Sequence, residues 1–491
     1  MTEDAKNHLL SEASELISSV MGLHFPESRM NDLERNLASA AHEFGFRDTE
    51  SFKRWLLINP LSKDHIEKLA SHLTVGETYF FREKENFAAL EEHILPELIR
   101  LRQGGERRLR IWSAGSSTGE EPYSIAILLR KLIADLNEWN ITILATEINP
   151  VAIKKAVEGI YTEWSFRGTP AWVKEGYFRK TKDGRHRINP RIKDMVTFSY
   201  LNLAEDVYPS LLNNTNAMDL IICRNVLMYF SPKHIRHAIH SFYNCLMDKG
   251  WLMVSPTEAL DVISTMFTAV NFTGATVFRK DARRAETTQA QVQTEVYQAP
   301  VSVAAAEKLP ASIGYAVRPE TGKPGKKAPD KTLYTEAAAA FEKGQYNEAV
   351  KRLEALSPEG EENAKASILL SQAYANQGRL EEAARECEKA IAADILNAQS
   401  HYLHAIILQE QGHLDEAAVA LRKTIYLNHD FALAYFVLGN IMGRLGKHRR
   451  SKKHLKAARG LLSSYKPEDV PVGGGGITAG RFLKIISTKI Q

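Results

Sequence analysis

The stretch Ile111-Trp-Ser-Ala-Gly-Ser-Ser-Thr-Gly-Glu-Glu-Pro-Tyr-Ser124 passes from an apolar run into a helical pattern through a loop of small residues. Such a loop between a strand and a helix lets a ligand approach the backbone at the carboxyl edge of a parallel sheet. Gly115 and Gly119 form GxxxG and not the GxGxxG of dinucleotide sites. The stretch therefore predicts an α/β fold with a ligand at this loop, although a helix-capping turn rich in acid would have the same composition.

Two carboxylates open the helix that follows this loop. Glu120 and Glu121 stand where a pyrophosphate would lie against a helix N-terminus, which disfavours a phosphate anion. A cationic ligand without phosphate fits this position better. S-adenosylmethionine, which carries a sulfonium and an ammonium group, is such a ligand.

The surrounding sequence indicates a sheet of several strands. Short apolar runs alternate with helical patterns, and we expect strands at residues 109–113, 141–145, 195–198, 219–223 and 250–254. This alternation predicts a doubly wound, mainly parallel α/β sheet. Residues 268–279 read as two strands joined by a short turn, which would close the sheet with antiparallel strands.

Polar residues follow two further strands at the edge where ligands bind. Glu147 comes directly after the second strand, and an acid there can accept hydrogen bonds from both ribose hydroxyls. The fourth strand runs into Cys223-Arg-Asn-Val-Leu-Met-Tyr-Phe230. Three strand ends of this kind, taken in order, favour a nucleoside cofactor.

The N-terminal segment, residues 1–75, reads as a small all-helical domain. Its apolar residues recur at steps of three and four, and Pro60 would stop one helix. Arg47, Lys53 and Arg54 are among the basic residues that punctuate it. These cations form either a solvated helix face or a surface that binds an acidic partner.

An internal repeat occupies residues 331–465. Gly344, Gly378, Gly412 and Gly446 follow one another at equal intervals of 34 residues, and each stands in a similar frame. This period resembles the tetratricopeptide repeat and predicts an α-helical superhelix. The array is either a protein-binding groove or a spacer. We expect a flexible linker at 281–330 and a flexible tail at 466–491.

Composition excludes several classes of protein. The chain has 491 residues, 44% of them hydrophobic, and 63 Lys and Arg against 59 Asp and Glu. It is therefore neither disordered overall nor basic enough to indicate nucleic-acid binding. Three scattered cysteines fit the reducing cytoplasm and no disulfide scaffold or zinc site. No signal peptide or membrane-spanning run is evident, so we expect a cytoplasmic protein.

Four motifs in order closely resemble the chemotaxis receptor methyltransferases of the CheR type. They are Thr78-Tyr-Phe-Phe-Arg-Glu83, Trp112 to Ser124, Asn202-Leu203 and Cys223 to Phe230, and the resemblance covers about residues 5–280. It implies an N-terminal receptor-recognition domain (1–75) and a methyltransferase domain (76–280). The implied activity is methyl transfer from S-adenosylmethionine to glutamate side chains of chemoreceptors, leaving S-adenosylhomocysteine.

The resemblance also implies roles for single residues. The positions that match cofactor-binding residues are Gly76, Thr78, Arg82, Gly115, Glu120, Glu147, Asn202, Leu203, Asn225 and Val226. Several relatives carry Asn at the position of Gly76, which offers only backbone contact. Arg82 and Tyr229 correspond to groups that position the reacting atoms, and Arg47, Lys53 and Arg54 would contact the acidic receptor helices. Arg82 could instead pair with Glu83 or Glu85, and Tyr229 could be packing alone.

The resemblance leaves two functions to be distinguished. The first is an enzyme, a protein-glutamate O-methyltransferase whose repeats bind an unidentified partner and which is recruited to receptor arrays. The alternative is a non-catalytic interaction protein that binds S-adenosylmethionine as a signal within a chemosensory pathway. A glutamate carboxylate is ionised at pH 7 and needs no general base, so the absence of a catalytic triad or metal motif fits the first function.

Overall fold

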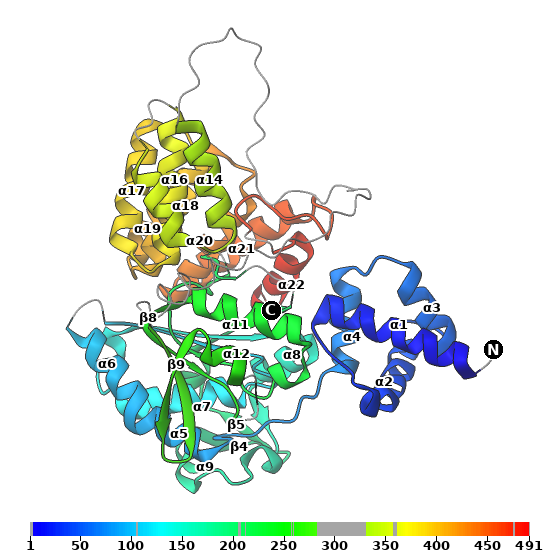
Figure 1. The fold of residues 1–491 in the computed structure, drawn as a ribbon. Coiled ribbons are helices and arrows are strands. Elements are labelled where there is room, and N and C mark those ends of the chain that lie inside the picture. Colours follow the sequence, from blue (N-terminus) through cyan, green and yellow to red (C-terminus); the bar gives the residue numbers. More distant parts are fainter. Residues whose placement is uncertain are drawn as a thin grey trace. The chain divides into compact units, whose positions relative to one another are not determined.

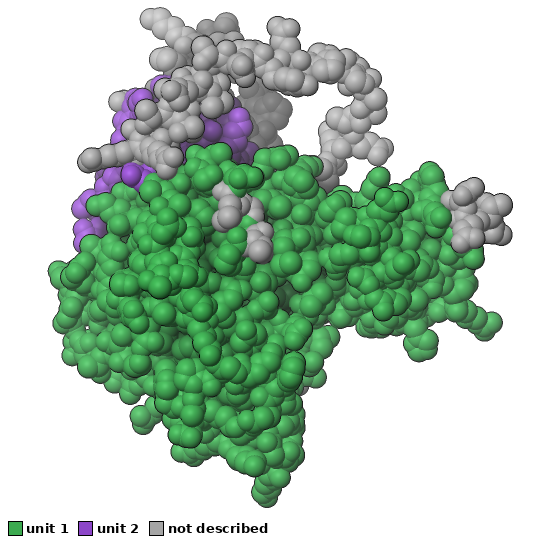
Figure 2. Space-filling model, turned by 60° about the horizontal axis from the view of Figure 1, so that its bottom comes forward, with its two compact units in different colours: residues 1–280, 376–378 green, residues 281–375, 379–491 purple. Residues whose placement is uncertain are grey.

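A computed structural model describes most of the chain as two compact units, residues 1–280 with 376–378 and residues 281–375 with 379–491 (Figure 2). The described residues are 3–104, 107–204, 208–211, 213–256, 258, 260–281, 330–356, 361–474 and 477–490. Each unit has its own fold and is described by itself. The linker expected at 281–330 lies almost entirely outside the described residues.

Four helices form the N-terminal part of the first unit, as the periodicity predicts. They are α1 (Glu3–Met21), α2 (Met30–Glu43), α3 (Thr49–Ile58) and α4 (Lys63–Leu73) (Figure 1). Their apolar stripes meet in one core, in which Ala13, Leu33 and Phe52 are fully buried. The carboxylate of Asp48 caps α3 by accepting the backbone N–H of Ser51 at 2.8 Å.

A seven-stranded sheet follows, in the order β6-β2-β1-β7-β8-β10-β9. The first five of these strands pair in parallel and the last two are antiparallel, which confirms the predicted doubly wound α/β class. The strands are β1 (Arg108–Ala114), β2 (Asn140–Glu147), β6 (Val196–Tyr200), β7 (Met218–Ile222), β8 (Leu246–Met253), β9 (Phe267–Phe272) and β10 (Ala275–Lys280).

Alternate residues of the buried strands face two different cores. Leu109 and Ile111 of β1 pack with the apolar face of α7, whereas Trp112 packs with Phe242 of α11. The sheet is therefore covered on both faces, as a parallel sheet must be. The helices around it are α5 (Lys84–Ala89), α6 (Leu95–Gln103), α7 (Glu120–Leu132), α8 (Pro150–Glu158), α9 (Ala171–Tyr177), α10 (Pro190–Lys193), α11 (Pro232–Cys245) and α12 (Leu260–Ser264) (Figure 1).

A small antiparallel sheet stands apart from the large one. Its order is β3-β5-β4, formed by β3 (Ile160–Tyr161), β4 (Phe178–Lys180) and β5 (His186–Ile188). Phe80 in the segment before α5 makes an edge-on contact with Phe178 of β4, with ring centroids 4.9 Å apart. This contact ties the small sheet to the segment that leads out of the N-terminal helices.

Paired helices make up the second unit, which confirms the repeat class. Gly344, Gly378, Gly412 and Gly446 each adopt a left-handed φ, between +71° and +87°, at the turn inside a helix pair. The helices are α14 (Asp330–Glu342), α15 (Tyr346–Glu354), α16 (Glu361–Asn376), α17 (Leu380–Ala393), α18 (Ala398–Glu410), α19 (Leu414–Leu427), α20 (Ala432–Arg444) and α21 (His448–Leu462) (Figure 1).

The flexible tail expected at 466–491 is wrong for its last part. Residues Ala479–Ile490 form a further helix, α22, which packs against α21. Phe482 and Ile486 are buried, and the ring of Phe482 lies 5.2 Å from that of Phe436 on α20. The apolar side of α22 thus covers the end of the repeat array.

Candidate functional site

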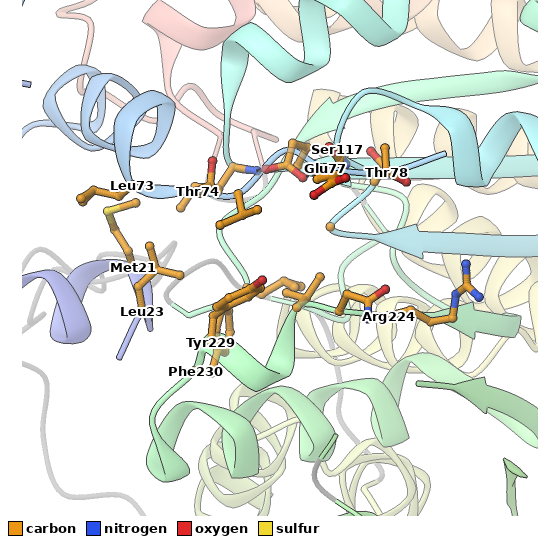
Figure 3. A pocket seen from close by; sticks show the side chains of 18 of the residues that line it. Met21, Leu23, Leu73, Thr74, Glu77, Thr78, Ser117, Arg224, Tyr229 and Phe230 are labelled. Carbon is orange, nitrogen blue, oxygen red and sulfur yellow. Dashed lines mark hydrogen bonds between the residues drawn. The ribbon is translucent and has the colours of Figure 1, made fainter. Parts of the chain in front are cut away.

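The strand order reverses between β1 and β7, which neighbour each other at the centre of the sheet. Open α/β sheets bind ligands in the crevice that such a reversal leaves at the carboxyl ends of the strands. The loop after β1 and the loop after β7 both line a cavity at this point (Figure 3). The location is the one that the loop of small residues predicts.

The N-terminal helices supply the opposite wall of the cavity. Figure 3 shows Met21, Leu23 and Leu73 together at one end, and Arg224 lies toward the other end. The cavity therefore has an apolar end formed by the helices and a charged end formed by the sheet.

Nine of the residues predicted from the resemblance line this cavity. They come from four strand ends and from the segment that joins the helices to the sheet: Thr78, Arg82, Gly115, Glu147, Asn202, Leu203, Asn225, Val226 and Tyr229. Gly76 is beside the cavity, where its carbonyl accepts a hydrogen bond from Ser117, itself a lining residue. Glu120, Arg47, Lys53 and Arg54 are not among the lining residues.

Glu147 presents a fixed carboxylate at the end of β2. Its side chain accepts backbone N–H groups of Ser117 at 2.9 Å and of Ile148 and Asn149, both at 3.0 Å. Burial raises the pKa of Glu147, while these three hydrogen bonds lower it. The arrangement holds the acid in one orientation, as a ribose-binding acid requires.

Asn202 has a structural role in addition to its place on the cavity. Its Nδ2 donates to the carbonyl of Val20 at 2.7 Å, and its Oδ1 accepts the N–H of Ala204 at 3.1 Å. The side-chain amide thus joins the end of α1 to the loop after β6. Leu203 is buried next to it.

The expected contact of Glu120 with the cavity is wrong in this structure. Its carboxylate turns into the protein, where Thr118 and Ser165 donate to it at 2.6 and 3.0 Å, and burial raises the pKa of Glu120. The neighbouring Glu121 lines the cavity instead and pairs with Arg224 at 2.8 Å. The adjacent glutamates in the sequence predicted an acid at the cavity. The sequence did not show which of the two faces the cavity.

Arg224 ties the loop after β7 to the segment before α5. Its guanidinium contacts Glu121, Glu83 at 3.3 Å and the carbonyl of Arg82 at 2.7 Å, and its side chain is only 3% exposed. Arg82 itself has no salt bridge among the described residues, so the expected alternative of pairing with Glu83 or Glu85 is not realised. Its guanidinium donates to the carbonyl of Glu77.

Tyr229 lies where the helical wall meets the sheet. Its backbone carbonyl accepts the N–H of His24 at 2.7 Å, and the guanidinium carbon of Arg29 is 5.3 Å from the centre of its ring. Arg29 lines the cavity and was not predicted. Its position in a turn between helices gave no periodic signal.

A buried carboxylate fixes the backbone of the loop after β7. Glu258 is fully buried and accepts four backbone N–H groups, those of Asn225, Val226, Met228 and Ser255, at 2.7 to 3.2 Å. Burial raises the pKa of Glu258, while these hydrogen bonds lower it. Asn225 has φ +57°, a left-handed conformation that the clamp supports.

Lys53 is not available as a substrate contact. Its side chain is 1% exposed, and its ammonium lies 2.9 Å from Glu50 and 3.0 Å from Glu34. The long aliphatic stem is buried in the helical core while the charge is neutralised by two acids. Arg47 and Arg54 are exposed on the same helical part of the chain.

Comparisons with known proteins identify the family. A family model described as the SAM binding domain of CheR methyltransferases matches residues 76–276. Chemotaxis protein methyltransferase 2 of Vibrio cholerae serotype O1 is 35% identical over 219 residues, which cover 45% of this chain and 74% of the relative. The chain belongs to the CheR methyltransferase family. S-adenosylmethionine is therefore its methyl donor.

Further relatives extend this assignment. The chemotaxis protein methyltransferase of Borreliella burgdorferi is 30% identical over 253 residues, covering 51% of this chain and 88% of the relative. A tetratricopeptide repeat model matches residues 340–407. A crystal structure of MamA covers 28% of this chain and 80% of its own at 23% identity, with a TM-score of 0.27, which is too low to carry an argument.

The residues on the cavity fit S-adenosylmethionine. Glu147 can accept from the two ribose hydroxyls, and Met21, Leu23 and Leu201 offer apolar surface for an adenine ring. The cavity also exposes Glu121, whose charge is of the right sign for a sulfonium or an ammonium group.

No helix in the described part of the chain is long and apolar enough to cross a bilayer.

We expect Gly115→Ala to weaken cofactor binding strongly. Gly115 has φ +79°, and an added Cβ would lie 2.3 Å from Cγ2 of Val226, so Val226 or one of the two loops would have to shift. Gly45→Ala is the matched control, because Gly45 has φ +82° and no atom within 4 Å of an added Cβ. Calorimetric affinity for S-adenosylhomocysteine should fall at least about tenfold for Gly115→Ala only. Equal losses in both variants would contradict the close approach as the cause.

We expect Glu258→Gln to weaken cofactor binding while the fold is retained. The amide replaces one acceptor oxygen with a donor, which leaves buried N–H groups of the loop unpaired at about 1–3 kcal/mol each. Affinity for S-adenosylhomocysteine should fall about tenfold or more. Glu15→Gln, at an exposed position on α1, is the control. A folded Glu258→Gln protein with unchanged affinity would show that the clamp does not position the loop.

Proposed function

We propose that the chain transfers the methyl group of S-adenosylmethionine to glutamate side chains of chemoreceptors, forming methyl esters. The observation that carries this proposal is the presence of two arginines on the cofactor cavity. Arg29 from the N-terminal helices and Arg82 from the joining segment both line it. A carboxylate acceptor is a group that a guanidinium binds well. The names of the relatives, chemotaxis protein methyltransferases, are consistent with a chemotaxis protein as the substrate.

The proposed acceptor makes few chemical demands on the protein. A glutamate side chain is ionised at pH 7, so no base has to remove a proton from it. The bound cofactor supplies an activated methyl group. The chain then has to align the carboxylate oxygen with that group and to exclude water. The apolar residues Met21, Leu23 and Leu73 would exclude water at one end of the cavity.

Three side chains have proposed roles at the acceptor end. Arg82, which has no salt bridge among the described residues, would bind a carboxylate of the cofactor or of the acceptor. Arg29 would bind the incoming glutamate, because it enters the cavity from the N-terminal helices. Tyr229 packs under the Arg29 guanidinium and would keep it in place, since the two are 5.3 Å apart.

The receptor contact would extend over the N-terminal helices. Arg47 and Arg54 are exposed there and remain proposed contacts for an acidic receptor helix, whereas buried Lys53 is removed from this surface. Rim charges of this kind act mainly on the rate of association. We also propose that the enzyme works in the cytoplasm, that it is recruited to receptor arrays, and that its repeats bind a partner protein.

Methyl transfer to protein is tested with purified enzyme, methyl-labelled S-adenosylmethionine and receptors encoded beside it. We expect label on the receptor that is released as methanol by base, because esters are base-labile. A receptor whose glutamates are replaced by glutamine is the control. Cofactor binding without label on any of these receptors would favour the alternative, a non-catalytic S-adenosylmethionine sensor.

We expect Arg29→Gln to raise the KM for the receptor by about ten- to hundredfold, because the variant would lose a charge-assisted hydrogen bond to the acceptor glutamate. Affinity for S-adenosylhomocysteine should change less than about twofold, a change of under about half a kcal/mol. Arg35→Gln is the control, because Arg35 is on the neighbouring helix with its side chain 77% exposed. A loss of cofactor affinity in Arg29→Gln would place this residue at the cofactor and not at the acceptor.

A further inference from the structure

The last helix of the repeats carries an unbroken stripe of positive charge. Arg449, Lys452, Lys453, Lys456 and Arg459 are all exposed on α21 and recur at steps of three and four, which places them on one face of the helix. The buried residues of α21 are on the opposite face: Ser451, Leu455, Ala458 and Leu462. We refer to the five cations as the α21 stripe.

The surroundings of the α21 stripe contain no compensating acid in the sequence. Residues 431–467 include nine Lys and Arg and no Asp or Glu, in a chain whose formal net charge is only +4. Within the described part of the chain, none of the five cations has a salt-bridge partner. The positive charge of this unit is therefore concentrated at one end of the array.

Like charges three or four residues apart destabilise a helix, and in the earlier repeats some cations pair with an acid on the same helix instead. On α15, Glu348 pairs with Arg352 at 2.8 Å, and on α17, Glu386 pairs with Lys389 at 2.7 Å. The equivalent positions of the previous repeat, 34 residues earlier in the sequence, are on α19. They are Asp415, Ala418, Val419, Arg422 and Ile425. The α21 stripe is thus a departure from the repeat pattern that costs stability within its own helix.

The chemistry of the stripe favours an acidic helix of a protein as its partner. No exposed large apolar side chain lies on α21 among the described residues, so it lacks the anchors of a helix that inserts into a membrane surface. No aromatic residue alternates with the cations, as a surface that stacks single-stranded bases would have. A row of cations with helical spacing matches carboxylates with the same spacing on a second helix.

We propose that the α21 stripe is a docking surface for a glutamate-rich helical segment of a partner protein. The methyl-accepting protein itself is the simplest source of such a segment, and this choice of partner rests on the proposed function. Binding at the repeats would then raise the local concentration of substrate for the catalytic domain on the same chain. The stripe would set the affinity for the receptor without touching the reacting atoms.

The test separates a docking role from a structural one. The probe is a synthetic alanine-based helix with Glu at positions i, i+4, i+7 and i+11, and its control peptide has Gln in place of Glu. The full-length protein should bind the Glu peptide at least about tenfold more tightly than the Gln peptide at low salt. Double reversal, Lys452→Glu with Lys456→Glu, should abolish this preference.

The control variant reverses charge elsewhere in the same unit. Lys343→Glu with Lys351→Glu changes the net charge equally at two exposed positions outside α21 and should leave peptide binding unchanged. The unfolding temperature of the repeats should stay the same or rise in the α21 variant, because the new acids pair with the remaining cations. A fall in unfolding temperature would overturn the proposal, since the stripe would then be structural.

Two further outcomes would also overturn the proposal. One is an equal loss of peptide binding in the α21 variant and the control variant. Binding would then depend on the net charge of the protein and not on the α21 stripe. The other is binding of anionic lipid vesicles or of single-stranded DNA through α21 with no binding of the Glu peptide. Peptide binding is measured without cofactor and does not depend on methyl transfer. A protein that does not bind the Glu peptide would contradict the docking proposal alone. A protein that does not methylate the receptor would contradict the proposed function alone.

Discussion

The loops that follow β1 and β7 meet where an added Cβ on Gly115 would lie 2.3 Å from a methyl group of Val226. Both loops line the cavity. A side chain at Gly115 would force Val226 or one of the two loops to shift. Glu258 then fixes the β7 loop by its backbone, and Arg224 ties that loop to the joining segment that carries Arg82. The close approach at Gly115, the buried Glu258 and Arg224 together hold the two loops and the joining segment in place.

Two buried acids near the cavity show how the protein stabilises ionised carboxylates at the end of a buried sheet. Burial penalises the ionised form of Glu147 and of Glu258, and the pKa of each is raised by it. Backbone N–H groups, three for Glu147 and four for Glu258, offset this penalty. Donors on the main chain cannot rotate away as side chains can. The acids are therefore held rigidly, and the catalytic domain needs little motion to present a finished site.

Much of the catalytic domain follows from local patterns in the sequence. The five parallel strands of the large sheet were visible as short apolar runs, and ligand-facing residues could be placed because parallel strands end at the same edge. The loop after β1 showed where the ligand binds but not which of Glu120 and Glu121 faces it, since adjacent residues of a helix point about 100° apart. That choice depends on Arg224, which is a hundred residues away in the sequence and pairs with Glu121.

Errors elsewhere have the same non-local origin. Lys53 looks like a surface cation until Glu34, on another helix, is placed beside it in the core. The segment after residue 466 contains a glycine run and reads as a tail, because the surface that Phe482 and Ile486 cover exists only once α20 and α21 are packed. Arg29 has no motif around it and becomes notable through its distance to Tyr229. Tertiary contacts decide all three, and no window along the chain contains them.

The repeats tolerate the charge on α21 because their stability comes from the opposite face. The five cations form five like-charged pairs at three- or four-residue spacing, which cost about 1–2.5 kcal/mol in total at 0.2–0.5 kcal/mol each. Burial of Leu455 and Leu462 contributes about 1.5–3 kcal/mol for each side chain, so the helix remains bound to the array. Gly439 on α20 allows this packing, since a Cβ there would lie 2.8 Å from Leu455. A helix anchored so firmly on one face can carry an unbalanced charge on the other.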